Sequence, residues 1–168
     1  MKTIDLYGDN FTGSVAGVRQ ACRAAVLRNG RLLLSYAKET DIYMLPGGGL
    51  EAGETDAECC VREAAEETGL VIEVQSCALE INEYYGDLRF TSRYFAGTVT
   101  GQCEMKLTVQ EKEIGLTPVW LPLSEAAEIF SEHRSLTAED EEKRGIYLRE
   151  LTALLELFPG MIQEGENT

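Results

Sequence analysis

Three glutamates within one short stretch, Glu63, Glu66 and Glu67, are the residues best placed to do chemistry. On a helix, spacings of three and four residues gather their side chains on one side. Three neighbouring carboxylates repel one another, and Arg62 alone does not compensate them. Clustered hard oxygen ligands suit Mg²⁺ or Mn²⁺, which commonly bridge carboxylates to substrate phosphates. The cluster therefore predicts a divalent-metal site that acts on phosphates.

The flanking residues predict how this cluster is positioned. A glycine-rich loop, 47–49, is expected to let a ligand approach the backbone. Thr55 or Asp56 can cap a helix that runs to about Thr68, and Gly69 suits its left-handed C-terminal residue. The face opposite the carboxylates is expected to pack on a sheet. That face holds Ala57, Val61, Ala64, Ala65 and Thr68.

The same stretch resembles the Nudix box at every fixed position. The matching residues are Gly48, Glu54, Arg62, Glu63, Ala64, Glu66, Glu67, Gly69 and Leu70. An amphipathic surface helix with a solvated acidic face is the alternative, which a nine-position match disfavours. The resemblance implies an α/β fold, a Nudix-type α/β/α sandwich with a mixed sheet. It covers most of residues 18–131, less specifically outside the box.

The resemblance also implies an activity. Nudix-like proteins generally hydrolyse a pyrophosphate bond in a nucleoside diphosphate linked to another group. By likeness, the Mg²⁺ or Mn²⁺ ligands are Glu63, Glu66, Glu67 and the carbonyl of Gly47. Arg62 is expected to orient the carboxylates through Glu54 or Glu63.

The general base is left open by the sequence. It is either Glu63 or a glutamate from the later acidic segment 109–115, where Glu111 and Glu113 are the candidates. The competing interpretation for these two residues is ordinary solvated loop charge. His133, the single histidine, is expected on the surface rather than in catalysis.

Substrate-binding residues are sought among the arginines of the predicted strands. Arg19, Arg23, Arg89 and Arg93 are candidates to hold phosphates. The tyrosine pair Tyr84-Tyr85 lies close to where dinucleoside polyphosphate hydrolases keep a tyrosine, but at a slightly short offset from the box, and Tyr84 is taken as the candidate. The arrays typical of NADH or coenzyme A pyrophosphatases, and the proline typical of ADP-ribose enzymes, are absent. The nucleotide substrate therefore stays unassigned, with ADP-ribose, dinucleoside polyphosphates, nucleotide sugars and nucleoside triphosphates all open.

Composition sets further limits. A chain of 168 residues with 44% hydrophobic residues suits a single globular domain over 1–168. Its net charge of −14 argues against binding a nucleic-acid polymer, which requires a basic surface. The partner is therefore expected to be a small nucleotide. A non-catalytic nucleotide sensor is the alternative function, and an interaction domain or a homodimer formed by the apolar side of the last helix is a further one.

The five cysteines are odd in number and lack zinc-site spacing, so reduced thiols in a cytoplasmic protein are expected. No stretch is long and apolar enough to suggest a membrane segment. The chain is expected to begin with a lead-in strand and loop, 1–17, and to end with a helix, 137–158, and a loose tail, 160–168. Strands are expected over 19–27, 31–36, 71–80, 88–98, 103–107 and 116–121, with turns at Asn29-Gly30, 84–87 and Thr100-Gly101 and a short helix over 125–130.

Overall fold

A tight hairpin joins two neighbouring strands of the sheet, as the Asn29-Gly30 pair predicts. It joins β2 (Gly17–Arg28) to antiparallel β3 (Arg31–Ala37). Asn29 and Gly30 have φ values of 52° and 73°, the left-handed conformation that a two-residue turn of this kind requires at both positions. The predicted turn is therefore confirmed.

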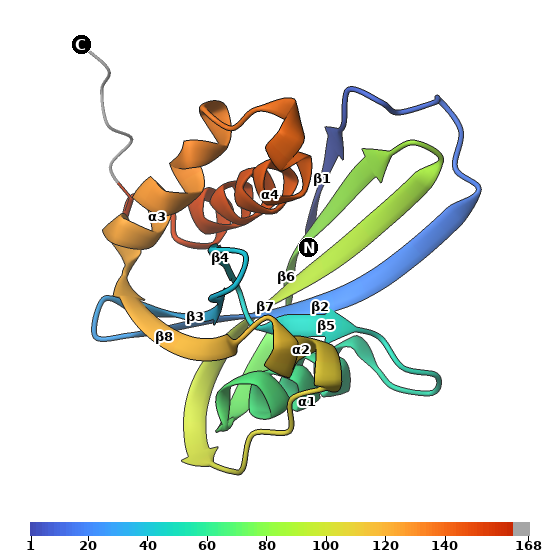
Figure 1. The fold of residues 1–168 in the computed structure, drawn as a ribbon. Helices are drawn as coiled ribbons and strands as arrows, with labels where there is room; N and C mark the ends of the chain where they lie inside the picture. The colour runs from blue at the N-terminus through green and yellow to red at the C-terminus, as the bar shows by residue number, and fades with distance from the viewer. Residues whose placement is uncertain (163–168) are drawn as a thin grey trace.

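The computed structural model describes residues 1–162, and in these residues the strands form one mixed sheet in the order β1-β6-β7-β2-β3-β4 (Figure 1). β1 pairs with β6, and β2 with β7, in parallel, while the remaining pairs are antiparallel. The other strands are β1 (Lys2–Tyr7), β4 (Ile42–Met44), β5 (Gly47–Gly49), β6 (Leu70–Tyr85), β7 (Leu88–Gln102) and β8 (Leu116–Pro122). The helices are α1 (Asp56–Thr68), α2 (Val109–Glu113), α3 (Leu123–Ser131) and α4 (Glu141–Leu157), with the 3-10 turns η1 (Glu132–Arg134) and η2 (Ala138–Asp140).

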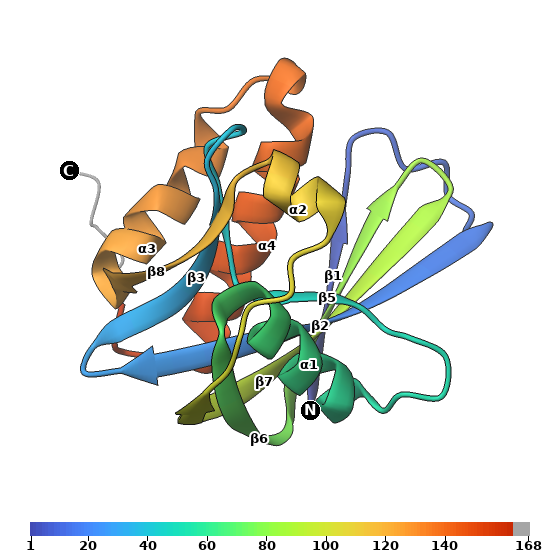
Figure 2. The same ribbon diagram turned by 60° about the horizontal axis from the view of Figure 1, so that its bottom comes forward.

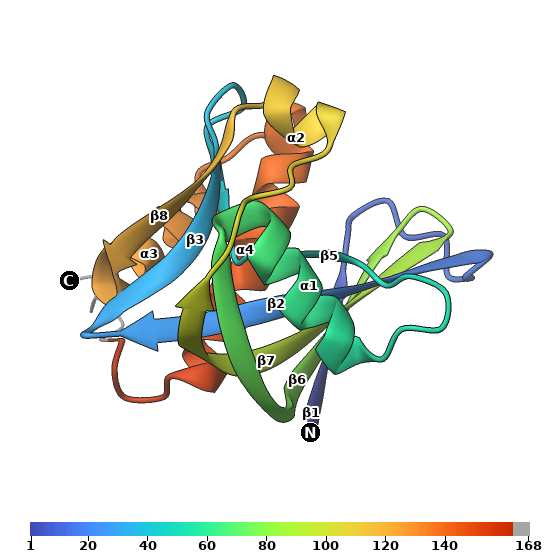
Figure 3. The same ribbon diagram turned by 90° about the horizontal axis from the view of Figure 1, so that it is seen from below.

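Helices cover both faces of the sheet. Figure 3 shows α1 on one face and α3 and α4 behind it on the other. The smaller core, between α1 and the strands, includes Cys60, Ala64 and Phe95, while the larger core lies beneath α3 and α4 and includes Tyr94 and Tyr147. This is the α/β/α sandwich that the sequence predicts. Within residues 1–162, no helix is long and apolar enough to cross a membrane.

Both ends of α1 follow their predicted caps. Thr55 accepts a hydrogen bond from the backbone N–H of Glu58, and the Glu58 carboxylate accepts one from the N–H of Thr55, which completes a capping box. Gly69 ends the helix at φ 69°, and its N–H donates to the carbonyl of Ala65. The helix therefore begins and ends at defined residues, which fixes the direction of the carboxylates it carries.

The glycine run is not the loop that its composition suggests. Gly47–Gly49 forms β5, which pairs antiparallel with residues 21–23 of β2. Glycine has little strand propensity of its own, so this pairing depends on tertiary contacts. The loop that leads into α1 instead covers residues 50–55.

Several other boundaries differ from expectation after α1. Tyr84 and Tyr85 belong to β6, and the turn is Gly86-Asp87. Thr100-Gly101 lies inside β7, while 103–107 forms no strand, because Cys103 and Lys106 donate their backbone N–H groups to the carbonyls of Gly69 and Glu66 at the end of α1. Figure 2 shows this segment passing the C-terminal end of α1 on its way to α2.

The last third also departs from expectation at its helix starts. α3 begins at Leu123 with Pro122 as N-cap, two residues before the expected start at 125. The terminal helix starts at Glu141, after the η2 turn that Thr137 precedes. Residues 160–162 of the expected tail are irregular, and 163–168 lie outside the described residues.

Candidate active site

Arg62 is the centre of the acidic cluster on α1. Its Nε and Nη2 donate to the two carboxylate oxygens of Glu54, at 2.8 and 3.0 Å. Its Nη1 donates to Glu63 at 2.7 Å and to Glu66 at 3.2 Å, and Nη2 also donates to the carbonyl of Gly49. The bidentate pairing holds the pKa of Glu54 at about 2. One guanidinium therefore fixes three carboxylates against the backbone of β5.

Glu67 has a different environment from Glu63 and Glu66, the other two predicted metal ligands on α1. Its side chain is buried, and Oε2 accepts hydrogen bonds from the Ser35 hydroxyl at 2.6 Å and from the backbone N–H of Gly47 at 3.2 Å. Burial raises the pKa of Glu67 to about 7, against the lowering effects of Ser35 and of the nearby Arg23 charge. Among the described residues, Glu67 forms no ion pair, so its charge is poorly compensated.

Glu63 lies directly against the glycine strand. A Cβ placed on Gly48 would be 2.5 Å from the Glu63 carboxyl carbon, so only glycine leaves room for this carboxylate. Burial raises the pKa of Glu63, opposed by Arg62, while the charges of Glu66 and Glu111 raise it further. Glu63 is therefore a buried carboxylate held between a glycine backbone and a guanidinium.

The acidic segment 109–115 forms a short helix rather than a loop. Thr108 and Glu111 make a capping box at its start, in which Glu111 accepts from the N–H of Thr108 at 2.7 Å. Glu111 is half-buried and lies close enough to raise the pKa of Glu63, whereas Glu113 is exposed. The structure thus separates the two later candidates, with Glu111 nearer to the cluster.

The four oxygen donors are not arranged as a finished metal shell. Within residues 1–162, no group of three or more His, Cys, Asp or Glu side chains is positioned to hold a metal ion. Arg62 holds Glu63 and Glu66, while Glu67 is directed to Ser35. The chemistry of the donor set nevertheless fits a divalent cation, because its carboxylates outnumber its cations. Glu63 and Glu66 share the Arg62 guanidinium, and within residues 1–162 the buried Glu67 forms no ion pair.

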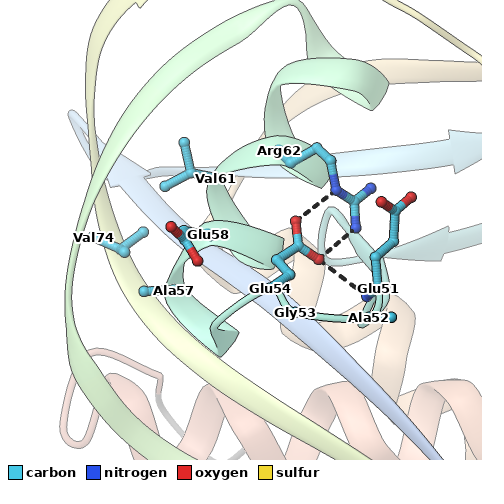
Figure 4. A pocket seen from close by; sticks show the side chains of 9 residues that line it. All are labelled: Glu51, Ala52, Gly53, Glu54, Ala57, Glu58, Val61, Arg62 and Val74. Carbon is cyan, nitrogen blue, oxygen red and sulfur yellow. Dashed lines mark hydrogen bonds and ion pairs between the residues drawn. The ribbon is translucent and has the colours of Figure 1, made fainter.

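The cluster lies near two cavities. The larger is an open groove of about 640 Å³ at the start of α1, and Figure 4 shows Glu54 and Arg62 on one side of it and Val61 and Val74 on the other. Glu63, Glu66 and Glu67 do not line this groove. A second cavity, of about 410 Å³, lies between the sheet and α4.

The predicted substrate-binding arginines do not share one face. Arg23 lines the cavity beneath α4, and its Nη1 donates to the carbonyls of Leu45 and Gly47 at 3.3 and 3.5 Å. Arg93 pairs in register with Cys22 and points to the α1 face, where it forms ion pairs with Glu80 and Asp56. Arg93 is thus already satisfied by acidic partners and lies apart from Arg23.

The remaining predicted binding residues lie at the edge of the fold. Arg19 is exposed and opposite Phe90 in register, and Arg89 is half-buried. Tyr84 stacks on exposed Tyr7 at 4.7 Å between ring centroids and donates to Asp5, so it is directed away from the α4 cavity.

Two residues of the α4 cavity, Glu83 and Arg149, were not singled out from the sequence, and both form part of its floor. Of the predicted tyrosine pair, Tyr85 lines the cavity and Tyr84 does not. Strand alternation was the available signal, because Glu83 and Tyr85 share one face of β6 and Tyr84 lies on the other. Arg149 carried no such signal, since it follows Glu83 by 66 residues in the chain.

Cys59, Trp120 and His133 have mainly structural environments. Cys59 is fully buried in the smaller core, and its thiol donates weakly to the carbonyls of Gly48 and Gly49. Trp120 packs against the same core, with the Arg28 guanidinium 4.6 Å from its ring centroid. His133 is half-buried in η1, with Nδ1 3.0 Å from the carbonyl oxygen of Phe130.

Comparison with known families decides the class of protein. The family model described as NUDIX domain matches residues 18–140, which includes the glycine strand, α1 and the acidic segment. The chain belongs to the Nudix family. The Nudix match ends shortly before α4, so the helix that closes the second cavity lies outside it.

Solved structures resemble the chain over 63% to 86% of its length. A Nudix hydrolase from Nitrosomonas europaea superposes with a TM-score of 0.59 at 20% identity, covering 78% of this chain and 88% of its own. The E. coli ORF135 protein superposes with a TM-score of 0.54 at 18% identity, covering 86% of this chain and 95% of its own. A MutT Nudix hydrolase from Burkholderia pseudomallei superposes with a TM-score of 0.51 at 22% identity, covering 63% of this chain and 84% of its own. At these identities the likeness establishes the fold alone.

Proposed function

We propose that this Nudix protein hydrolyses a pyrophosphate bond in a nucleoside diphosphate linked to another group, with a divalent cation bound at α1. The observation that carries the proposal is the carboxylate arrangement: Glu63 and Glu66 share one guanidinium, and Glu67 is buried and forms no ion pair with any residue that the structure describes. Such a charge excess is unfavourable unless a cation compensates it. The family membership of residues 18–140 supports the same reaction class.

Glu63, Glu66 and Glu67 would hold Mg²⁺ or Mn²⁺, with the carbonyl of Gly47 as a fourth donor. When bound, the cation would neutralise charge on the phosphoryl oxygens and lower the pKa of attacking water. Glu63 contacts Arg62 through Oε1 and Glu66 contacts it through Oε2, so each would offer its other carboxylate oxygen to a cation. Arg62, itself fixed by its bidentate contact with Glu54, therefore acts as a positioning residue that holds these carboxylates together.

The chain's own residues also supply proton transfer and substrate positioning. Glu111 is our candidate for the general base, because it is half-buried and close to Glu63, while Glu113 is exposed. Arg23 is our candidate for a phosphate contact, because it lies between the α4 cavity and Gly47, whose backbone N–H contacts Glu67. These placements favour Glu111 over Glu113 and Arg23 over Arg19 and Arg93.

The direct test is product release from a nucleotide panel with and without Mg²⁺. The panel contains ADP-ribose, dinucleoside polyphosphates, nucleotide sugars, NADH and nucleoside triphosphates. Mg²⁺-dependent cleavage of one class, abolished by a chelator and restored by Mg²⁺ or Mn²⁺, is the expected result. Tight nucleotide binding without cleavage of any member would instead favour the non-catalytic sensor.

A further inference from the structure

The cavity beneath α4 combines apolar walls with a charged floor. Met44, Tyr85, Phe90 and Ile146 line its sides. The rings of Tyr85 and Phe90 meet edge to face, with centroids 6.4 Å apart. Gly145 is what admits Tyr85 so close to α4, since a Cβ there would be 2.5 Å from the Tyr85 hydroxyl. Walls of this kind suit a flat ring system.

The floor is a buried network of opposite charges. Arg149 donates from Nη1 to Glu83 at 3.1 Å and from Nη2 to Glu150 at 2.8 Å. Glu150 also accepts from the Tyr94 hydroxyl and lies 3.9 Å from Nε of Arg23. Glu83 and Arg149 are 4% and 7% exposed, and both line the cavity.

The network leaves hydrogen-bonding capacity unused at the cavity. The buried Nε–H groups of Arg149 and Arg23 have no hydrogen-bond partner among the described residues. Glu83 uses Oε2 for Arg149, and no described residue donates to its Oε1. The two Nε atoms are fully buried, so they do not face the cavity. Glu83 lines the cavity and its Oε1 is not among the fully buried unpaired atoms, so this oxygen is the acceptor available to a polar ligand.

Charge decides which part of a nucleotide enters. The floor is neutral overall, because Arg23 and Arg149 are balanced by Glu83 and Glu150. Its rim carries two more carboxylates, Glu141 and Glu142. A phosphate would meet this acidic rim without a surplus cation to receive it. An uncharged ring with polar edges fits the cavity better, and about 410 Å³ is ample for a nucleoside.

We propose that the α4 cavity binds the nucleobase of the substrate, and that Glu83 and Arg149 select a base with an exocyclic amino group beside an acceptor atom. This inference rests on the proposed function. It narrows the substrate to nucleotides of cytosine, guanine or adenine, which should bind more tightly than nucleotides of uracil or hypoxanthine. The amino group donates to Glu83, and the neighbouring acceptor accepts from Arg149. In uracil a carbonyl replaces the amino group of cytosine. Two acceptors then face each other, and Oε1 of Glu83 is left without a donor.

The position of Arg23 connects this cavity to the carboxylates. Its Nη1 contacts the carbonyl of Gly47, and the N–H of the same glycine contacts Glu67. A base on the cavity floor therefore directs its phosphates past Arg23 toward α1. Base selection and cleavage thus use neighbouring but separate residues.

The test is equilibrium binding to the metal-free protein, measured by calorimetry in EDTA. The probes are three matched pairs, CMP with UMP, GMP with IMP and AMP with IMP. We expect the amino nucleotide of at least one pair to bind about tenfold or more tightly, as for loss of a hydrogen bond to a charged group. Glu83→Gln should bring that ratio to within threefold, because an amide can also donate to a carbonyl. The control Glu73→Gln, at an exposed position elsewhere on β6, should leave the ratio unchanged.

The wild-type ratios alone keep the proposal testable if Glu83→Gln does not fold. Ratios within threefold in all three pairs, tighter binding of the nucleotide that lacks the amino group in every pair, or a ratio that survives Glu83→Gln would each overturn it. Cleavage of nucleotides without base discrimination would reject this inference and leave the proposed hydrolase intact. Base discrimination without cleavage would support this inference and reject the proposed hydrolase activity.

Discussion

Three consecutive glycines of β5 should respond to alanine in three different ways. At Gly47 an added Cβ would clash with the carbonyl oxygen of Cys22, and its φ of +155° is one that side chains rarely adopt. At Gly48 the Cβ would meet only the carboxyl end of Glu63, and at Gly49 it would meet open space. Gly47→Ala therefore damages the backbone, Gly48→Ala displaces one carboxylate, and Gly49→Ala changes neither.

The magnitudes follow from these contacts. Overpacking against backbone costs about 1–3 kcal/mol and a strained conformation about as much again, so Gly47→Ala should lower the free energy of unfolding by about 2–5 kcal/mol. Gly48→Ala should cost under about 1 kcal/mol, because a flexible side chain can move. To regain ordinary contact from 2.5 Å, however, the Glu63 carboxyl must move by about 1 Å, and a misplacement of that size can cost on the order of 100-fold in rate.

Urea unfolding, Mn²⁺ binding and hydrolysis of the best nucleotide would be measured on all three variants. The expected pattern is a stability loss confined to Gly47→Ala and, among folded variants, a loss of metal affinity and rate confined to Gly48→Ala. Gly49→Ala is the matched control. Equal rates for Gly48→Ala and Gly49→Ala would refute the placement of Glu63 in the site.

Three further predictions concern the buried carboxylate and the base. Because the folded-state pKa of Glu67 is raised to about 7 from 4.5, the folded state holds this proton more tightly, so metal-free stability should fall by about 3 kcal/mol as pH rises from 4.5 to 7, measured by urea unfolding in EDTA. Saturating Mg²⁺ should reduce that loss. Ser35→Ala removes a hydrogen bond that lowers this pKa, so the pH at which Mn²⁺ affinity is half-maximal should move upward, and a downward move would contradict the assignment. Glu111→Gln should lower kcat by about 10²-fold or more while Glu113→Gln retains it, and the opposite ranking would reject Glu111 as the base.

The elements with local signals were predictable from sequence. The Asn29-Gly30 hairpin and the caps of α1 at Thr55 and Gly69 depend on residues next to one another in the chain, and the structure has them as expected. β5 was not predictable in this way. Its glycines have no strand propensity, and only pairing with β2 makes them a strand.

The environment of the carboxylates was also hidden from local patterns. Helical spacing places Glu63 and Glu67 on one side of α1, but it suggests a solvated face, whereas both are buried beneath β5 and Ser35 of β3. The opposite face was expected to pack on the sheet, but its residues Ala57, Val61 and Ala65 are only half-buried. Cys59 and Cys60 are the fully buried residues of α1 in the smaller core, together with Ala64. Burial of this kind is set by tertiary packing, which residue spacing does not encode.

Glu67→Gln offers the most direct test of the claim that α1 binds a cation for pyrophosphate hydrolysis. The substitution keeps the size of the side chain and removes its charge. Circular dichroism should show the wild-type fold, while Mn²⁺ affinity measured by electron paramagnetic resonance falls at least tenfold and Mg²⁺-dependent turnover falls by about 10² or more. A folded variant with unchanged Mn²⁺ affinity and turnover would contradict the account.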